Sequence, residues 1–294
     1  MKEKSFDCKL SFDEEDLFSF IESGNINEIE EFLKNKINIW DYRDKNNDNS
    51  TVLHLSVSKN SYLITKMFTE YCKVLDENSL QNFINETNNN GITALHYASF
   101  SGNIKIIQLL IDNGAILDIK TRKGLNIIHY CAQGNKPNSL MYFYIRLKDN
   151  YNSKLINEFI KVGDDEGLTP LHWAAFSNAE DVMMYLINLD IFQNRNQKKE
   201  FIDKMDKNGY TPLHLSVKNK SERLVKRLLQ NGASSDISDN KHRTPLDLAF
   251  SMGNLNIIEI LRKNRSCQIC SYNLPIKPIK KSPKLIIFVF FFNL

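Results

Sequence analysis

Five histidines recur along this 294-residue chain, and imidazole is the commonest metal ligand in proteins. They are His54, His96, His129, His172 and His214, separated by 42, 33, 43 and 42 residues. Ligands that share one ion must all approach it to about 2 Å. Whether these histidines can act together therefore depends on the elements that carry them.

Other chemistry-bearing residues are sparse. Cys267-x-x-Cys270 is half of a zinc site, and neither a second cysteine pair nor a nearby histidine completes it. Metal binding, acylation beside a membrane and plain cysteines in a linker all remain open for this pair. The sequence contains no Gly-x-Ser-x-Gly, phosphate-binding glycine loop or His-Glu-x-x-His motif. We therefore predict no catalytic residue, no cofactor and no metal, and expect the acids Asp164-Asp165-Glu166 to be solvated.

Each histidine belongs to a repeated signature, clearest in Gly167-Leu168-Thr169-Pro170-Leu171-His172-Trp173-Ala174-Ala175. Copies occupy 209–214 and 91–96, and weaker copies occupy 124–129, 49–54 and 242–247, the last with Asp247 in place of histidine. The base period is 33 residues. Three intervals contain nine or ten extra residues, which we expect to form loops or extended helix ends around 76–82, 150–158 and 193–200.

The signature has local physical reasons. Glycine accepts the positive φ of a tight turn, threonine caps a helix through its hydroxyl, and proline suits the first helical position. A helix is thus predicted at each copy, with Trp173 in the core. A second helix follows, since Ile104, Ile107 and Leu110 recur at helical spacing, and Asn113-Gly114-Ala115 and Asn231-Gly232-Ala233 predict left-handed helix ends.

The Thr-Pro-Leu-His-x-Ala motif at this period resembles the ankyrin repeat, and the resemblance covers residues 15 to 264. It implies an all-α solenoid of about seven helix-turn-helix repeats with β-hairpin loops and a concave face for a protein partner. The repeats would be 15–48, 49–88, 89–121, 122–164, 165–206, 207–239 and 240–264. One histidine per layer, about 10 Å from the next, excludes a shared metal. Hydrogen bonding of each imidazole to hairpin backbone is the expected role.

Two repeats depart from the pattern. Residues 15–48 lack the Thr-Pro start, and we interpret them as an N-terminal capping repeat after a polar segment, 1–14. Residues 122–164 have Asn126-Ile127 in place of Thr-Pro, and Pro137 starts a second helix early. We expect a local irregularity here, of the kind often used for specific contacts.

In ankyrin arrays the partner usually meets the hairpin tips and the exposed end of the first helix. Carried onto this sequence, the resemblance implies a partner-binding surface of Asn89, Asn90, Ile92, Phe100, Ser101, Arg122, Lys123, Leu125, Gln133, Asp165, Glu166, Leu168, Phe176, Lys207, Asn208, Tyr210, Lys218, Asn240 and Arg243. Phe100, Phe176 and Tyr210 would form a row of hot spots, with packing against the neighbouring repeat as the alternative for each.

Composition narrows the class of partner. The net charge of +3 arises from 38 basic and 35 acidic residues, so no electrostatic case for nucleic acid exists. The cysteine number, five, is odd, and the charged start Met1-Lys2-Glu3-Lys4 is unlike a secretory signal. A reducing, cytoplasmic setting fits best.

The C-terminal region differs from the array. A basic, proline-rich linker at 265–284 leads into an apolar tail at 285–294, too short to cross a bilayer alone. Apolar residues directly after lysines are typical of the start of a transmembrane helix at the cytoplasmic face, so we expect that the chain is cut short or that the tail contacts a membrane. The order of array, linker and apolar run is similar to that in membrane palmitoyltransferases, as is the segment Ala132-Gln133-Gly134-Asn135-Lys136-Pro137. Their Asp-His-His-Cys motif is absent.

Two functions are therefore predicted. The first is a protein-binding scaffold or adaptor, and the alternative is the substrate-recruiting ankyrin region of a membrane protein S-palmitoyltransferase without its catalytic part. Both predict a location in the cytoplasm or at the cytoplasmic face of a membrane.

Overall fold

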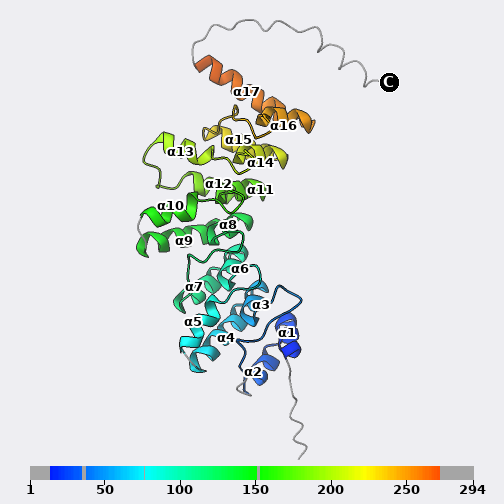
Figure 1. Cartoon of the computed structure of the whole chain (residues 1–294), viewed down its shortest axis with the longest axis vertical. Coiled ribbons are helices and arrows are strands. Elements are labelled where there is room, and N and C mark those ends of the chain that lie inside the picture. Colours follow the sequence, from blue (N-terminus) through cyan, green and yellow to red (C-terminus); the bar gives the residue numbers. More distant parts are fainter. Residues whose placement is uncertain (1–13, 35–37, 76, 151–152, 272–294) are drawn as a thin grey trace, which may run out of the picture.

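The computed structural model describes residues 14–34, 38–75, 77–150 and 153–271. Figure 1 shows helices stacked in an elongated column, with α1 near one end and α17 at the other. No strand occurs in these ranges, where Asp44 and Ser50 form an isolated β-bridge. The predicted all-α solenoid is confirmed.

Seven helix pairs build the column. Their first helices are α1 (Glu14–Ser23), α3 (Val52–Ser58), α6 (Ala94–Ser101), α8 (Ile127–Gln133), α11 (Pro170–Phe176), α14 (Pro212–Lys218) and α16 (Pro245–Ser251). Their second helices are α2 (Ile26–Lys34), α4 (Tyr62–Leu75), α7 (Ile104–Asp112), α9 (Pro137–Asn150), α12 (Glu180–Ile187), α15 (Glu222–Gln230) and α17 (Leu255–Ser271). From α3 to α16, each first helix packs against the next one.

The three insertions form helices of their own, which corrects the expectation of loops or extended helix ends. They are α5 (Glu77–Asn85), α10 (Ser153–Lys161) and α13 (Arg195–Ile202). In α5 the buried residues Leu80, Phe83 and Ile84 have helical spacing, so one apolar stripe packs inward while the polar majority faces solvent. The polar composition of these stretches hid that stripe.

Helix starts follow the predicted capping chemistry. The Thr211 hydroxyl accepts a hydrogen bond from the His214 amide at 3.4 Å, and Pro212 occupies the first turn of α14. In α8, Asn126 replaces threonine, and its Oδ1 accepts amide hydrogen bonds from Ile128 and His129 at 3.0 and 3.2 Å. Helix α9 begins at Pro137, as predicted.

The loop between layers needs glycine for two separate reasons, as Gly209 illustrates. Its φ of +78° is a conformation that L side chains rarely adopt. A Cβ there would also lie 2.6 Å from the Asn240 amide nitrogen of the next loop. Tight stacking of successive loops therefore depends on this residue.

One hydrophobic core runs through the whole column, from Leu17 in α1 to Leu261 in α17. Helix α17 continues past residue 264, where the sequence predicts the linker to begin. Most of that linker and the entire apolar tail lie outside the described residues. None of the described helices combines the length and hydropathy that a bilayer-spanning segment requires.

Candidate partner-binding surface

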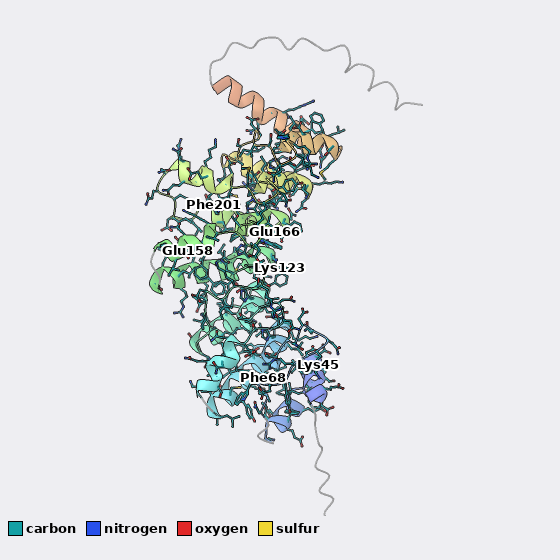
Figure 2. All side chains as sticks on the ribbon, in the orientation of Figure 1. Lys45, Phe68, Lys123, Glu158, Glu166 and Phe201 are labelled. Atoms are coloured by element: carbon teal, nitrogen blue, oxygen red, sulfur yellow. The ribbon has the colours of Figure 1, made fainter. Side chains whose placement is uncertain are left out.

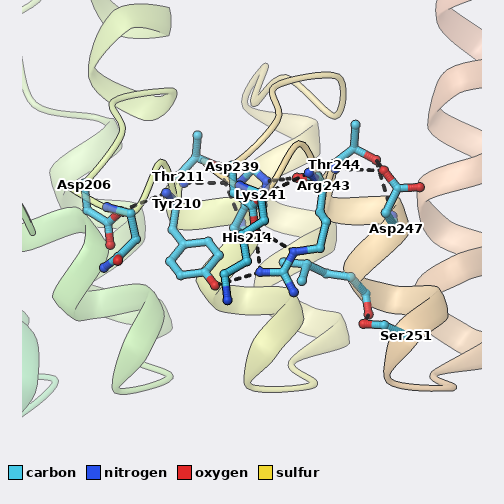
Figure 3. A network of polar contacts seen from close by, with 12 residues as sticks. Asp206, Tyr210, Thr211, His214, Asp239, Lys241, Arg243, Thr244, Asp247 and Ser251 are labelled. Carbon is cyan, nitrogen blue, oxygen red and sulfur yellow. Dashed lines mark hydrogen bonds and ion pairs between the residues drawn. The ribbon is translucent and has the colours of Figure 1, made fainter.

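Four of the five histidines join neighbouring layers: Nδ1 binds the N-cap amide of its own layer, and Nε2 binds a loop carbonyl of the next layer. In α11, His172 Nδ1 accepts from the Thr169 backbone N–H at 3.2 Å, so this nitrogen is unprotonated. The proton therefore sits on Nε2, which donates to the Tyr210 carbonyl of the next layer at 3.0 Å. Equivalent carbonyl contacts are made by His54, His129 and His214, the last drawn in Figure 3. The predicted role in hydrogen bonding to loop backbone is confirmed for these four.

Burial keeps these rings neutral. It lowers the pKa of His54, His96 and His172 to about 4 and that of His129 to about 3, and it also lowers the pKa of His214. Within the described ranges no group of three or more histidine, cysteine, aspartate or glutamate side chains could hold a metal ion. The loop-carbonyl contacts of His54, His129, His172 and His214 link successive layers.

Neighbouring loops form a ladder of backbone hydrogen bonds along one side of the column. The amides of Arg122, Asp165, Lys207 and Asn240 donate to the carbonyls of Asn90, Lys123, Glu166 and Asn208 at 2.9, 3.0, 2.9 and 3.1 Å. Each loop thus presents two adjacent tip residues, and the tips follow one another without a gap. Figure 2 labels Lys123 and Glu166 on the same side of the molecule.

A hollow of about 660 Å³ opens beside this ladder. Three consecutive loops and the helices α8 and α11 line it through Asn90, Ile92, Thr121, Arg122, Lys123, Leu125, Tyr130, Gln133, Asp164, Asp165, Glu166, Leu168 and Trp173. It lies at the repeat of 122–164, where the sequence is least regular.

Trp173 is half-buried: it packs against the core and also lines the hollow, so the predicted core position is only partly correct. Its indole N–H donates to Asp164 Oδ2 at 2.9 Å, and its ring meets that of Phe176 edge to face at 5.7 Å. Asp164 Oδ1 accepts the amides of Glu166 and Leu168 at 3.0 and 2.9 Å, which closes the loop. The ring orientation is thus set by a carboxylate that the loop itself holds.

Nine of the thirteen lining residues belong to the partner-binding surface that the family resemblance implies. They are Asn90, Ile92, Arg122, Lys123, Leu125, Gln133, Asp165, Glu166 and Leu168. The other ten predicted residues lie outside this hollow: Asn89, Phe100, Ser101, Phe176, Lys207, Asn208, Tyr210, Lys218, Asn240 and Arg243. Phe100 and Phe176 are exposed, at 48% and 58%.

Three predicted positions are less open than expected. Leu125 is only 6% exposed and contributes to the wall of the hollow rather than to free surface. Tyr210 is half-buried, with the Lys218 ammonium 4.5 Å from its ring centroid. Its hydroxyl accepts from Arg243, which also donates to Asp239 at 2.7 Å (Figure 3). Intramolecular contacts therefore occupy much of Tyr210 and Arg243, whereas Lys218 remains exposed.

Sequence reasoning missed Tyr130 and Trp173 as surface residues, and a signal for them exists. Both directly follow the signature histidine, at a position where Tyr97 also stands and where Leu55 and Leu215 are buried. An aromatic residue is too large to be covered completely at this position by the next loop. The change from leucine to an aromatic residue thus marks where the surface opens.

The cysteine motif Cys267-x-x-Cys270 lies within the backbone of α17, in a part whose side chains are outside the described set. Cys72 and Cys131 are buried free cysteines. Burial raises the pKa of Cys72 to about 12 and also raises that of Cys131, so both thiols stay protonated.

Stacked helix pairs with a ladder of projecting loops define a helical repeat protein, in which a shared core carries a variable surface. A family model described as ankyrin repeats (3 copies) matches residues 72–154, 142–233 and 196–273. The chain belongs to the ankyrin-repeat family. Repeats of this family generally mediate protein–protein interaction.

Several curated proteins are similar to this chain. A "Probable serine/threonine-protein kinase" of Dictyostelium discoideum is 33% identical over 181 residues, which are 61% of this chain and 20% of that protein. Inversin of Mus musculus is 28% identical over 199 residues, 65% of this chain and 17% of inversin. The human transient receptor potential cation channel subfamily A member 1 is 28% identical over 143 residues, which are 49% of this chain and 12% of the channel subunit. The chain spans a fifth or less of the length of these relatives.

Proposed function

We propose that this chain is a non-enzymatic scaffold module that binds an extended segment of a protein partner along the row of its loop tips. The observation that carries the proposal is the hollow of about 660 Å³, which an oriented tryptophan lines together with a basic and an acidic loop. The partner segment would insert an apolar side chain against Trp173 and Tyr130.

Residue type and preorganisation support this site. Tryptophan, tyrosine and arginine are the residues in which binding energy concentrates, and Trp173, Tyr130 and Arg122 meet here. The Asp164 carboxylate orients the indole before any partner arrives, which reduces the entropy lost on binding. The volume is that of a pocket for one or a few side chains, and the continuous loop ladder extends it into a longer track.

Selection from a random peptide library displayed on phage tests the proposal. Peptides selected on the wild-type protein should bind Trp173→Ala at least about 30-fold more weakly, because truncating a buried hot-spot aromatic costs about 2 kcal/mol or more. A double variant with Arg122→Ala and Lys123→Ala should also weaken binding. Because both residues are exposed, this variant removes no core contact. Phe250→Ala, on an exposed residue of α16 outside the hollow, is the matched control and should bind like the wild type.

Unchanged melting of all variants is required for this comparison. Peptides that bind all variants equally, or selection of none, would contradict the proposed site.

The palmitoyltransferase alternative rests on the order of array, linker and apolar tail in the sequence. It treats residues 15–264 as the recruiting module, 265–284 as a linker and 285–294 as a membrane-contacting tail. Flotation with liposomes, with and without residues 275–294, tests the membrane contact. Equal flotation of the two proteins would eliminate it.

A further inference from the structure

The loop tips form a row whose spacing matches that of an extended peptide. Successive layers lie about 10 Å apart, the packing distance of helices, and an extended chain advances about 3.3 Å per residue. About three partner residues therefore cover one layer. The hydrogen bonds from the Asp165 amide to Lys123 and from the Lys207 amide to Glu166, at 3.0 and 2.9 Å, keep the tips in line.

The charges along this row alternate in blocks. Arg122 and Lys123 form a basic tip, Asp165 and Glu166 form an acidic tip, and Lys207 begins the next tip with a positive charge. All five side chains are exposed. None of them makes an ion pair within the ranges that the structure describes, although neighbouring tips carry opposite charge. The pattern is thus available to a partner.

We infer that the occupant of the hollow, given the proposed function, is an extended protein segment with an acidic, a basic and an acidic residue at intervals of three. The first acid meets Arg122 and Lys123, the base meets Asp165 and Glu166, and the second acid meets Lys207. An apolar residue between the first two charges meets Trp173. The order of charges reads the same in both directions, so only the apolar residue beside Trp173 fixes the chain direction of the segment.

The probes are two short fluorescein-labelled peptides of equal length. One contains Glu-Leu-Ser-Lys-Leu-Ser-Glu, and the other contains the charge-inverted Lys-Leu-Ser-Glu-Leu-Ser-Lys. Fluorescence polarisation with the full chain should give a Kd on the order of tenfold lower for the first peptide, because like charges are juxtaposed in the second complex. The ratio should shrink with added salt, as the Debye length falls from about 10 Å at 0.1 M to about 3 Å at 1 M.

The decisive experiment uses a variant in which all five charges are inverted. Its substitutions are Arg122→Glu, Lys123→Glu, Asp165→Lys, Glu166→Lys and Lys207→Glu. Exposure of these residues predicts an unchanged fold, checked by the urea midpoint. This variant should prefer the second peptide by a similar factor. Lys105→Glu, an exposed charge on α7 away from the loop tips, is the control and should keep the wild-type preference.

Equal Kd values for the two peptides, a preference that the inverted protein does not reverse, or binding of neither peptide would each overturn the inference. The phage selection separates this failure from that of the proposed function. Selected peptides that depend on Trp173 but lack the charge pattern would retain the hollow as a binding site and reject the pattern.

Discussion

The sixth layer (α14 and α15) and the seventh layer (α16 and α17) both begin with Thr-Pro-Leu, which His214 follows in the sixth layer and Asp247 in the seventh. His214 Nδ1 accepts the Thr211 amide at 3.2 Å, and Nε2–H donates to the Arg243 carbonyl of the following layer at 3.2 Å. Asp247 Oδ2 accepts the Thr244 amide and hydroxyl at 2.8 and 2.7 Å (Figure 3). Both side chains close their own helix, but the carboxylate has no N–H with which to reach a further loop carbonyl.

The two side chains also differ in burial. His214 is fully buried, whereas Asp247 is exposed. At the position three residues further on, Val217 is 1% exposed and Phe250 is 47% exposed. No further helix pair follows α17 within the described residues. The comparison teaches that an imidazole at this position binds the loop of the layer that covers it, while a carboxylate is suited to a layer whose helix start is exposed.

The largest expected effect is a loss of stability in acid, and it arises from the layers that carry a buried histidine. The unfolded chain takes up protons on histidine as the pH falls below 6.5, while His54, His96 and His172 in the fold resist protonation down to about pH 4. The contribution of these histidines to the free energy of unfolding is thus fully present above pH 6.5. It falls as the pH drops towards 4, by about 1.4 kcal/mol per pH unit for each such histidine.

Urea denaturation at a series of pH values between about 7 and 5 measures this slope. His172→Gln should flatten it by the contribution of one group, because the amide can replace both hydrogen bonds without titrating. A free energy of unfolding that stays level over this range would contradict neutral burial of the histidines.

Exchanging the two residues sharpens the comparison. His214→Asp places a carboxylate in a fully buried position and leaves the Arg243 carbonyl without its donor, so we expect a loss of about 3 kcal/mol. Asp247→His changes an exposed residue and should alter stability by less than about 0.5 kcal/mol. Both are measured by urea denaturation at neutral pH. Similar losses for the two variants would refute the assigned roles.

The smallest expected difference concerns two glycines with positive φ. Gly209, at +78°, lies under the next loop, whereas Gly253 in the last layer, at +65°, has no atom within 4 Å of the point that a Cβ would occupy. Alanine at either site carries the backbone strain of about 1 kcal/mol, and Gly209→Ala should cost at least about 1 kcal/mol more because its Cβ meets the Asn240 amide. Thermal melting of the pair provides the measurement, and equal Tm shifts would contradict tight loop stacking.

Prediction from sequence succeeded where neighbouring residues decide the outcome, and it failed where packing decides. The histidine contacts and the start of α9 at Pro137 were foreseen from the motif. The exposure of Arg122 and Glu166 was foreseen, because both lie at loop tips. The position of Trp173 was not, because burial of a helix residue depends on the loop that covers it. Leu125 is the opposite case: it was expected at the surface, and packing buries it.

The amino-acid sequence by itself determined the layers. Glycine turns, threonine caps and the helical spacing of apolar residues act within about four residues of one another, so they need no distant partner. Only the tertiary structure decided that Arg122 and Asp165 stand on adjacent tips, that the insertions fold as α5, α10 and α13, and that Asp164 orients Trp173 beside a hollow. These relations join segments whose proximity exists only after the layers have stacked, because a single layer cannot bury its own apolar face.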